Sequence, residues 1–137
     1  DKKPKYLTEV QPGFVYGLDE QNYNKSFAIV CEGQLDAIHV DGCALGGSEI
    51  SDQQAMLLNR LQKQIIVCPD RDIAGKKLVE QAIELGWSVA LPDWSSEVTD
   101  ISEAVSKYGR LYTLYSIANT AEDSPLKIRL RAKKWFI

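Results

Sequence analysis

The sequence lacks several features that would assign it to a specialised class. No apolar run approaches the roughly 20 residues that a membrane-spanning helix needs, so we expect no membrane partner. Histidine occurs once, and Cys31, Cys43 and Cys68 include no C-x-x-C pair. A zinc site formed with His39 therefore lacks suitable ligand spacing. An odd number of cysteines, two of them inside apolar runs, is typical of free buried thiols in a reducing compartment.

Neither sign of charge is in large excess. The chain has 16 Lys and Arg against 19 Asp and Glu, a net charge of −3, which is not the balance of a protein that holds duplex DNA by charge alone. Its 137 residues, 45% hydrophobic and 26% charged, have the size and composition of one ordinary folded domain. Cations nevertheless crowd the C-terminal end of the chain: Lys127, Arg129, Arg131, Lys133 and Lys134.

The chain also lacks an initial methionine and an apolar leader. It begins with Asp1-Lys2-Lys3-Pro4-Lys5, a charged stretch without the apolar segment of a signal peptide. We therefore expect a cytoplasmic domain that was excised from a longer protein or processed, with some functions outside this segment.

Short apolar runs alternate with helical patterns, which is the signature of a parallel sheet covered by helices. The expected strands are 27–31, 43–45 (a short strand or a turn), 64–68 and 87–91. The expected helices are 34–40, 51–61, 73–85, 101–108 and 110–119. The sequence thus predicts an α/β fold with a mainly parallel sheet of about four strands and helices on both faces.

This pattern also suggests how the chain is organised. Residues 1–25 are less regular and are expected to pack on the core as a lead-in, with a possible edge strand or hairpin, and residues 26–109 form the expected core. Residues 110–137 are expected as a C-terminal helix, a loop at 121–125 and a basic amphipathic tail, for which helix and strand both stay open.

Acidic residues directly follow the two most apolar strands. Glu32-Gly33 ends the first, and Asp70 and Asp72 follow the second. Parallel strands end at one edge of a sheet, where ligands bind, so these side chains should share a crevice. Gathered carboxylates repel one another unless a cation is present, and an all-oxygen donor set favours Mg²⁺ or Mn²⁺. Gly33 and Gly75 would let a phosphate-bearing substrate approach the backbone.

Simpler structural roles compete with this hypothesis for each residue alone. Asp72 stands where a helix N-cap belongs, and Glu32 has the position of a surface residue at a strand end. Asp100 and Glu103 have the spacing of a capping box, a role that can coexist with metal binding. Lys76 and Lys77 are either a solvated helix face or phosphate contacts.

The two acidic segments together resemble the toprim domain in its primase form. Residues 29–37, IVCEGQLDA, are similar to a first motif in which glutamate is followed by glycine and, four positions after the glutamate, by aspartate. Residues 66–76, IVCPDRDIAGK, are similar to a second motif, Asp-x-Asp-x-Ala-Gly. Bacterial-type and phage DNA primases carry this form, whereas toprim nucleases and topoisomerases usually differ after Glu-Gly. The resemblance covers about residues 14–109.

The resemblance implies a metal-dependent nucleotidyltransferase that makes short RNA primers on single-stranded DNA during replication. By that resemblance Glu32 handles protons during nucleotide addition, and Asp70 and Asp72 hold Mg²⁺ or Mn²⁺. Metal ions held by carboxylates orient the attacking hydroxyl and neutralise charge on the phosphate. The implied metal-site residues are Glu32, Asp36, Asp70, Asp72 and Asp100.

The third acidic patch of the family departs from the usual pattern here. Asp100 falls where its first acid is expected, but Ser102 stands where some relatives have a second aspartate. Residues 97–99 also lack the lysine often found there. These departures leave the geometry of a second metal open.

The implied partners are single-stranded DNA, ribonucleoside triphosphates and a replicative helicase, in the bacterial host cytoplasm if the protein is phage-encoded. The C-terminal tail, with Trp135 and Phe136 beside its cations, is either a single-strand binding surface or a solvated face with an aromatic anchor. The candidate nucleic-acid-binding residues are Lys76, Lys77, Arg129, Arg131, Lys133 and Lys134.

Three alternatives remain. Another toprim enzyme, a nuclease or a topoisomerase fragment, would break phosphodiester bonds. A non-catalytic toprim module would recruit a helicase or bind DNA without metal. A phosphoacceptor receiver domain is also α/β, but it expects an acidic pair at its first strand, which Glu32-Gly33 does not supply.

Overall fold

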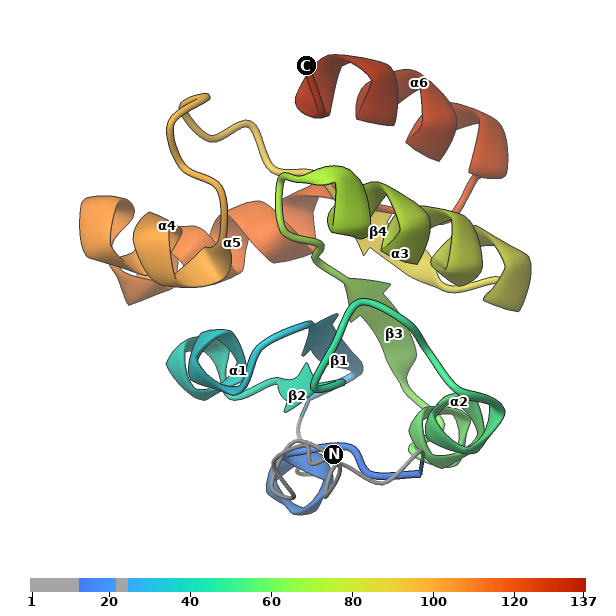
Figure 1. The fold of residues 1–137 in the computed structure, drawn as a ribbon. Coiled ribbons are helices and arrows are strands. Elements are labelled where there is room, and N and C mark those ends of the chain that lie inside the picture. Colours follow the sequence, from blue (N-terminus) through green and yellow to red (C-terminus); the bar gives the residue numbers. More distant parts are fainter. Residues whose placement is uncertain (1–12, 22–24) are drawn as a thin grey trace, which may run out of the picture.

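A computed structural model describes residues 13–21 and 25–137 of the chain. Five strands form one sheet in the order β2-β1-β3-β4-β5, seen nearly edge-on in Figure 1. The strands are β1 (Phe27–Cys31), β2 (Cys43–Ala44), β3 (Gln64–Val67), β4 (Ser88–Ala90) and β5 (Ala121–Glu122). Neighbouring strands among the first four are parallel, and only β5 runs antiparallel to its neighbour. The predicted α/β fold with a mainly parallel sheet is confirmed.

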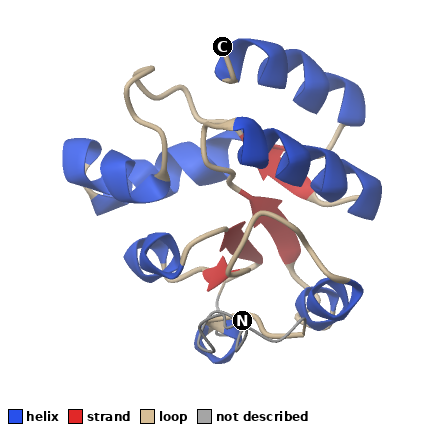
Figure 2. Ribbon diagram, viewed as in Figure 1, coloured by secondary structure: helices blue, strands red, loops and turns tan. Residues whose placement is uncertain are grey.

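Helices cover both faces of this sheet (Figure 2). The helices are α1 (Gln34–Val40), α2 (Asp52–Asn59), α3 (Ile73–Leu85), α4 (Ile101–Tyr108), α5 (Arg110–Thr120) and α6 (Pro125–Trp135), with a short 3₁₀ turn η2 (Leu18–Glu20). Buried residues from α2, α3 and α6 form one core layer, and those from α1, α4 and α5 form the other. The central strands are buried on both faces, which explains why β1 and β3 are continuously apolar rather than alternating.

Local sequence signals fix where the helices begin and end. Ser51 caps α2 through a capping box with Gln54, as its spacing predicted. Asp72 caps α3 through a hydrogen bond from Gly75 N, and Gly86 ends that helix in the left-handed conformation with φ 77°. The start of α3 is therefore held directly behind β3, at the edge of the sheet where Asp70 lies.

The number of strands is one more than the predicted four. The expected loop 121–125 instead contributes the two-residue strand β5, which pairs with β4. Such a short edge strand carries no periodicity that a sequence pattern can reveal. The same segment then enters α6, with Ser124 as N-cap and Pro125 in the first turn, so the tail is a helix rather than a strand.

Both C-terminal helices are part of the core. Ile117 of α5 and Ile128 of α6 are fully buried on opposite faces of the sheet. Of the expected N-terminal lead-in, only residues 13–21 and 25 are described, and the rest, including Tyr6, lies outside the described residues. Tyr16 forms an isolated antiparallel bridge with Ala44, next to β2. The division into 1–25, 26–109 and 110–137 stays a proposal.

Within the described residues, no helix has both the length and the apolar character that crossing a membrane requires.

Candidate functional site

The edge of the sheet where β1 and β3 end brings Glu32 and Asp70 together. These strands are hydrogen-bonded neighbours, with Ile29 opposite Ile66 and Val30 opposite Val67. The residues just beyond their ends are therefore also adjacent, and Glu32 Oε2 accepts a hydrogen bond from Asp70 N at 3.2 Å. Two acids 38 residues apart in the sequence thus share one site.

The turn after β3 is shaped by a glycine. A Cβ atom placed on Gly75 would lie 1.9 Å from the carbonyl oxygen of Asp70, so only glycine allows the first turn of α3 to pack against this backbone. The space beside Gly75 is therefore filled by the protein itself. Our expectation that Gly75 opens the backbone to a phosphate is wrong.

A second pair of acids reaches the same region from the helices on one face. Asp36 on α1 is 7% exposed, and its Oδ1 accepts hydrogen bonds from Ser102 N at 2.9 Å and Ser102 Oγ at 2.5 Å. Asp100 caps α4, with its Oδ1 accepting from Glu103 N at 2.8 Å. The predicted capping role of Asp100 is confirmed, although Glu103 binds Thr99 rather than the backbone of Asp100.

Burial and the charges of neighbouring acids raise the pKa of three of these groups, Glu32, Asp70 and Asp100. Partial burial is the largest cause of the raised pKa of Asp70, and the charges of Glu32, Asp36, Asp100 and Asp72 add to it, so that this pKa reaches about 7. Burial also raises the pKa of Glu32, although the hydrogen bond from Asp70 N opposes the shift. The pKa of Asp100 rises for the same main reason, with Asp36 as the largest charge acting on it. The site therefore favours a proton or a bound cation over bare negative charge.

The candidate nucleic-acid-binding cations lie on α3 and α6. Lys76 and Lys133 line an open groove of about 570 Å³ between the two helices, which has Val79, Ala132 and Phe136 among its apolar residues.

Two cations of this group already make ion pairs. Arg129 makes an ion pair with Glu80 across the same groove at 3.0 Å. Arg131 Nη2 lies 3.7 Å from Glu122, whereas Lys77 and Lys134 are exposed.

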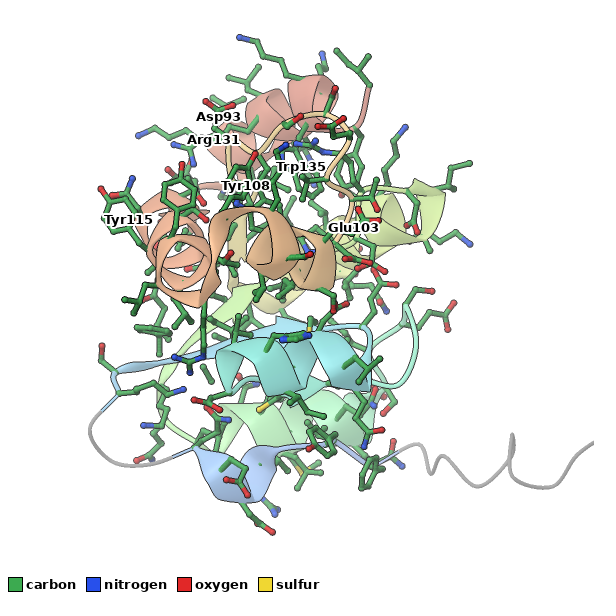
Figure 3. All side chains as sticks on the ribbon, turned by 90° about the vertical axis from the view of Figure 1, so that its left-hand side faces the viewer. Asp93, Glu103, Tyr108, Tyr115, Arg131 and Trp135 are labelled. Carbon is green, nitrogen blue, oxygen red and sulfur yellow. The ribbon has the colours of Figure 1, made fainter. Side chains whose placement is uncertain are left out.

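Trp135 is part of the core rather than of the surface. It is 8% exposed, and its Nε1 donates to Pro92 O at 2.7 Å. Figure 3 shows it inside the molecule, near Asp93 and Arg131, with which it lines a common pocket. Of the two roles open for the tail, an aromatic anchor to the core is the one that the packing of Trp135 supports.

Comparison with known proteins assigns the chain to a protein family. A family model described as Toprim-like matches residues 29–105, more than half of the chain, and this range includes Glu32, Asp36, Asp70, Asp72 and Asp100. The chain belongs to the Toprim-like family. A DNA primase of Aquifex aeolicus (strain VF5) is 29% identical to this toprim-like domain over 128 residues, covering 80% of the chain and 26% of the primase.

Solved structures of the same kind share the fold. The zinc-binding and RNA polymerase domains of the Aquifex aeolicus primase match with a TM-score of 0.67 and 24% identity, over 91% of this chain and 36% of that one. The RNA polymerase domain of Mycobacterium tuberculosis primase DnaG matches with a TM-score of 0.61 and 20% identity, over 79% and 41%. The resemblance to the toprim domain of DNA primases is thus confirmed, and the toprim-like domain spans about a quarter of the curated relative's length.

The donor set of the toprim-like domain suits a hard divalent cation. Glu32, Asp36, Asp72 and Asp100 each engage one carboxylate oxygen with a backbone N–H, and no hydrogen bond among the described residues engages the other oxygen. Across residues 13–21 and 25–137, no three acidic, histidine or cysteine side chains gather into a complete metal cage. Mg²⁺ commonly binds through one or two carboxylates and keeps several waters, so the residues fit it without such a cage. One ion shared by Glu32, Asp70 and Asp72 stays a proposal.

Sequence reasoning missed two residues of this region. It treated Ser102 only as a departure from the family pattern, yet Ser102 provides both hydrogen bonds to the buried Asp36. It assigned nothing to Arg71, which contacts the loop before α4 and the indole of Trp135. Only the placement of Arg71 between two motif aspartates could have drawn attention to it.

Proposed function

We propose that the chain is the catalytic toprim domain of a DNA primase, which uses Mg²⁺ or Mn²⁺ to make short RNA primers on single-stranded DNA. The observation that carries the proposal is the placement of Glu32 against Asp70, among acids whose charges raise the pKa of Asp70 to about 7. The Toprim-like family match and the curated primase relative support it.

In this proposal Asp70 and Asp72 hold the metal, and Asp36 and Asp100 support the site. A metal held by these carboxylates would supply positive charge that offsets charge on the phosphate and helps to orient the attacking hydroxyl. Ser102 keeps the buried carboxylate of Asp36 in one orientation through its two hydrogen bonds.

Glu32 is the proposed proton-handling group. A general base works best when its pKa lies near the working pH, and partial burial moves the pKa of Glu32 in that direction. The hydrogen bond from Asp70 N holds Oε2 in place, so Oε1 is the oxygen that would take a proton from the 3′-hydroxyl.

The remaining parts of the proposal rest on the primase relative. Single-stranded DNA and ribonucleoside triphosphates would be the substrates, a replicative helicase a partner, and the cytoplasm the location. Lys76, Lys77, Arg129, Arg131, Lys133 and Lys134 would contact nucleic acid through the α3 and α6 surfaces, which include the groove lined by Lys76 and Lys133.

The test substitutes Asp70→Asn, which keeps the size of the side chain and removes its charge. Primer synthesis from ribonucleotides on single-stranded DNA with Mg²⁺ is measured on the longest natural form of the protein, and Mn²⁺ binding on the 137-residue chain. We expect loss of both in the variant, with an unchanged circular dichroism spectrum.

Asp52→Asn is the matched control, because Asp52 is an exposed aspartate at the start of α2. It should retain both properties. Metal-dependent synthesis by Asp70→Asn at the parent's rate would refute the proposal, and metal-dependent nicking of plasmid DNA in place of synthesis would favour a toprim nuclease.

A further inference from the structure

Arg71 lies between the two aspartates of the Asp70-Arg71-Asp72 motif, but its side chain does not neutralise them. Its Nη1 donates to Ser95 O and Val98 O, and its guanidinium lies over the ring of Trp135. Its side chain is therefore directed toward the loop that precedes α4 and toward α6.

Arg71 joins the metal-site turn to that loop at three points. Its backbone N donates to Thr99 O at 2.8 Å. Its Nη1 donates to Ser95 O at 2.9 Å and to Val98 O at 3.4 Å. The loop carries Asp100 at its end, so these bonds set the position of Asp100 relative to Asp70.

The C-terminal helix completes the arrangement. The guanidinium carbon of Arg71 lies 4.4 Å from the centre of the Trp135 ring, within the range of a cation–π contact. The indole of Trp135 in turn donates to Pro92 O, at the other end of the same loop. In Figure 3 this loop passes close to Trp135 and to α6. Arg71 thus lies half-buried between the loop and α6.

We propose that Arg71 is a positioning residue that fixes the Asp100 loop against the Asp70-Asp72 turn and thereby couples the seating of α6 to metal binding. The inference rests on the proposed function, because it assumes that these acids bind a divalent cation.

The energetics of Arg71 support a role other than simple stabilisation. Burial lowers its pKa, which means that its charge is partly removed from water. Its Nε is buried and has no hydrogen-bond partner among the described residues. A buried unpaired donor costs free energy, so a less polar side chain would serve packing alone better. What the arginine uniquely offers is a flat, fixed group that stacks on the indole while it donates to two carbonyls.

The test compares Arg71→Lys and Arg71→Met with Arg60→Met in the 137-residue chain. Arg60 is the matched control, since it is an exposed arginine at the end of α2 that precedes β3, whereas Asp70 follows the other end of that strand. Mn²⁺ affinity is measured by electron paramagnetic resonance at a temperature where each variant is folded. Hydrogen exchange of the amides of residues 93–100 is followed in the absence of metal.

The two roles considered for Arg71 predict opposite changes in the Mn²⁺ affinity of Arg71→Met. If Arg71 acts only through its positive charge, Arg71→Met strengthens Mn²⁺ binding and Arg71→Lys leaves it unchanged. If Arg71 positions the loop, both variants weaken Mn²⁺ binding about tenfold or more, as for other residues that orient metal ligands. Both also speed amide exchange in residues 93–100, whereas Arg60→Met does neither.

Two further outcomes separate this inference from the proposed function. Parent-like Mn²⁺ affinity and parent-like exchange in Arg71→Lys and Arg71→Met would overturn the positioning role and leave the metal site intact. A parent chain that binds no Mn²⁺ would overturn both the proposed function and the inference. A lower melting temperature with unchanged Mn²⁺ affinity would overturn the positioning role and show that Arg71 contributes only to packing.

Discussion

The raised pKa of Asp70 predicts that the metal-free protein is destabilised by its own site. An unfolded chain releases the Asp70 proton near the ordinary aspartate pKa of about 3.9, whereas the folded protein holds it until about pH 7. Folding therefore becomes less favourable as pH rises between these two values, and the penalty is constant above them. Replacing Asp70 with Asn should remove this penalty, because the amide has no proton to release.

The magnitude follows from the size of the shift. Each pKa unit corresponds to about 1.4 kcal/mol, so a rise from about 3.9 to about 7 is worth about 4 kcal/mol at pH 8. Asp70 is only partly buried, and solvent screening reduces this to about 2 kcal/mol. The Asp70 carboxylate accepts no hydrogen bond from the described residues, so the substitution breaks none of those bonds.

The assay is urea unfolding of the parent and of Asp70→Asn, in a metal chelator, at pH 5 and pH 8. We expect the variant to be more stable by about 2 kcal/mol at pH 8, with less than half of that difference at pH 5. Added Mg²⁺ should stabilise the parent at pH 8 and not the variant, because a ligand stabilises only the form that binds it.

Asp52→Asn again provides the control. It should change stability by less than about 1 kcal/mol, the usual effect of an exposed charge at a helix start, with little difference between the two pH values. The reasoning is refuted if Asp70→Asn is less stable than the parent at pH 8, or if its effect is the same at pH 5 and pH 8.

Two further predictions concern the backbone and the thiols. Gly75→Ala should lower the free energy of unfolding by about 1–3 kcal/mol or more and weaken Mn²⁺ binding, because its Cβ would collide with Asp70 O, whereas Gly47→Ala, which meets nothing within 4 Å, should do neither. Calorimetry and Mn²⁺ titration check this, and equal behaviour of the two variants would contradict it. Burial raises the pKa of Cys43 to about 11 and that of Cys31 and Cys68 above the ordinary thiol range, so a disulfide reagent at pH 8 should label none of them in the folded protein and all three in urea. Rapid labelling of any thiol in the folded chain would show that the core opens there.

The parts of the fold that the sequence could predict depend on local chemistry. β1 and β3 are short and mostly apolar runs, so their existence could be read from the sequence pattern. Helix caps are equally local, and Ser51 and Asp72 were expected at the positions where they are found. The convergence of Glu32 and Asp70 followed from one topological rule, that parallel strands end at one edge.

The parts that it could not predict depend on distant partners. β5 has two residues and exists because β4 offers it an unpaired edge. α6 alternates apolar with basic residues, a pattern that suits a helix or a strand, and what fixes it is the burial of Ile128 and Trp135 in the core layer that also holds α3. The crowding at Gly75 is likewise invisible in sequence, because the atom that requires glycine is a backbone oxygen five residues earlier.

The sequence pointed to the acidic residues and not to Arg71, because the hydrogen-bond partners of the Arg71 side chain are backbone carbonyls. An acidic side chain at a strand end has a recognisable chemistry, whereas Arg71 binds Ser95 O and Val98 O, which any residue type could provide. Its guanidinium also stacks on Trp135, which is 64 positions away and whose burial depends on the docking of α6. Residues of this kind can be found only once the path of the backbone is known. It follows that the metal affinity of a toprim-like domain should be sensitive to substitutions that leave every acidic residue in place.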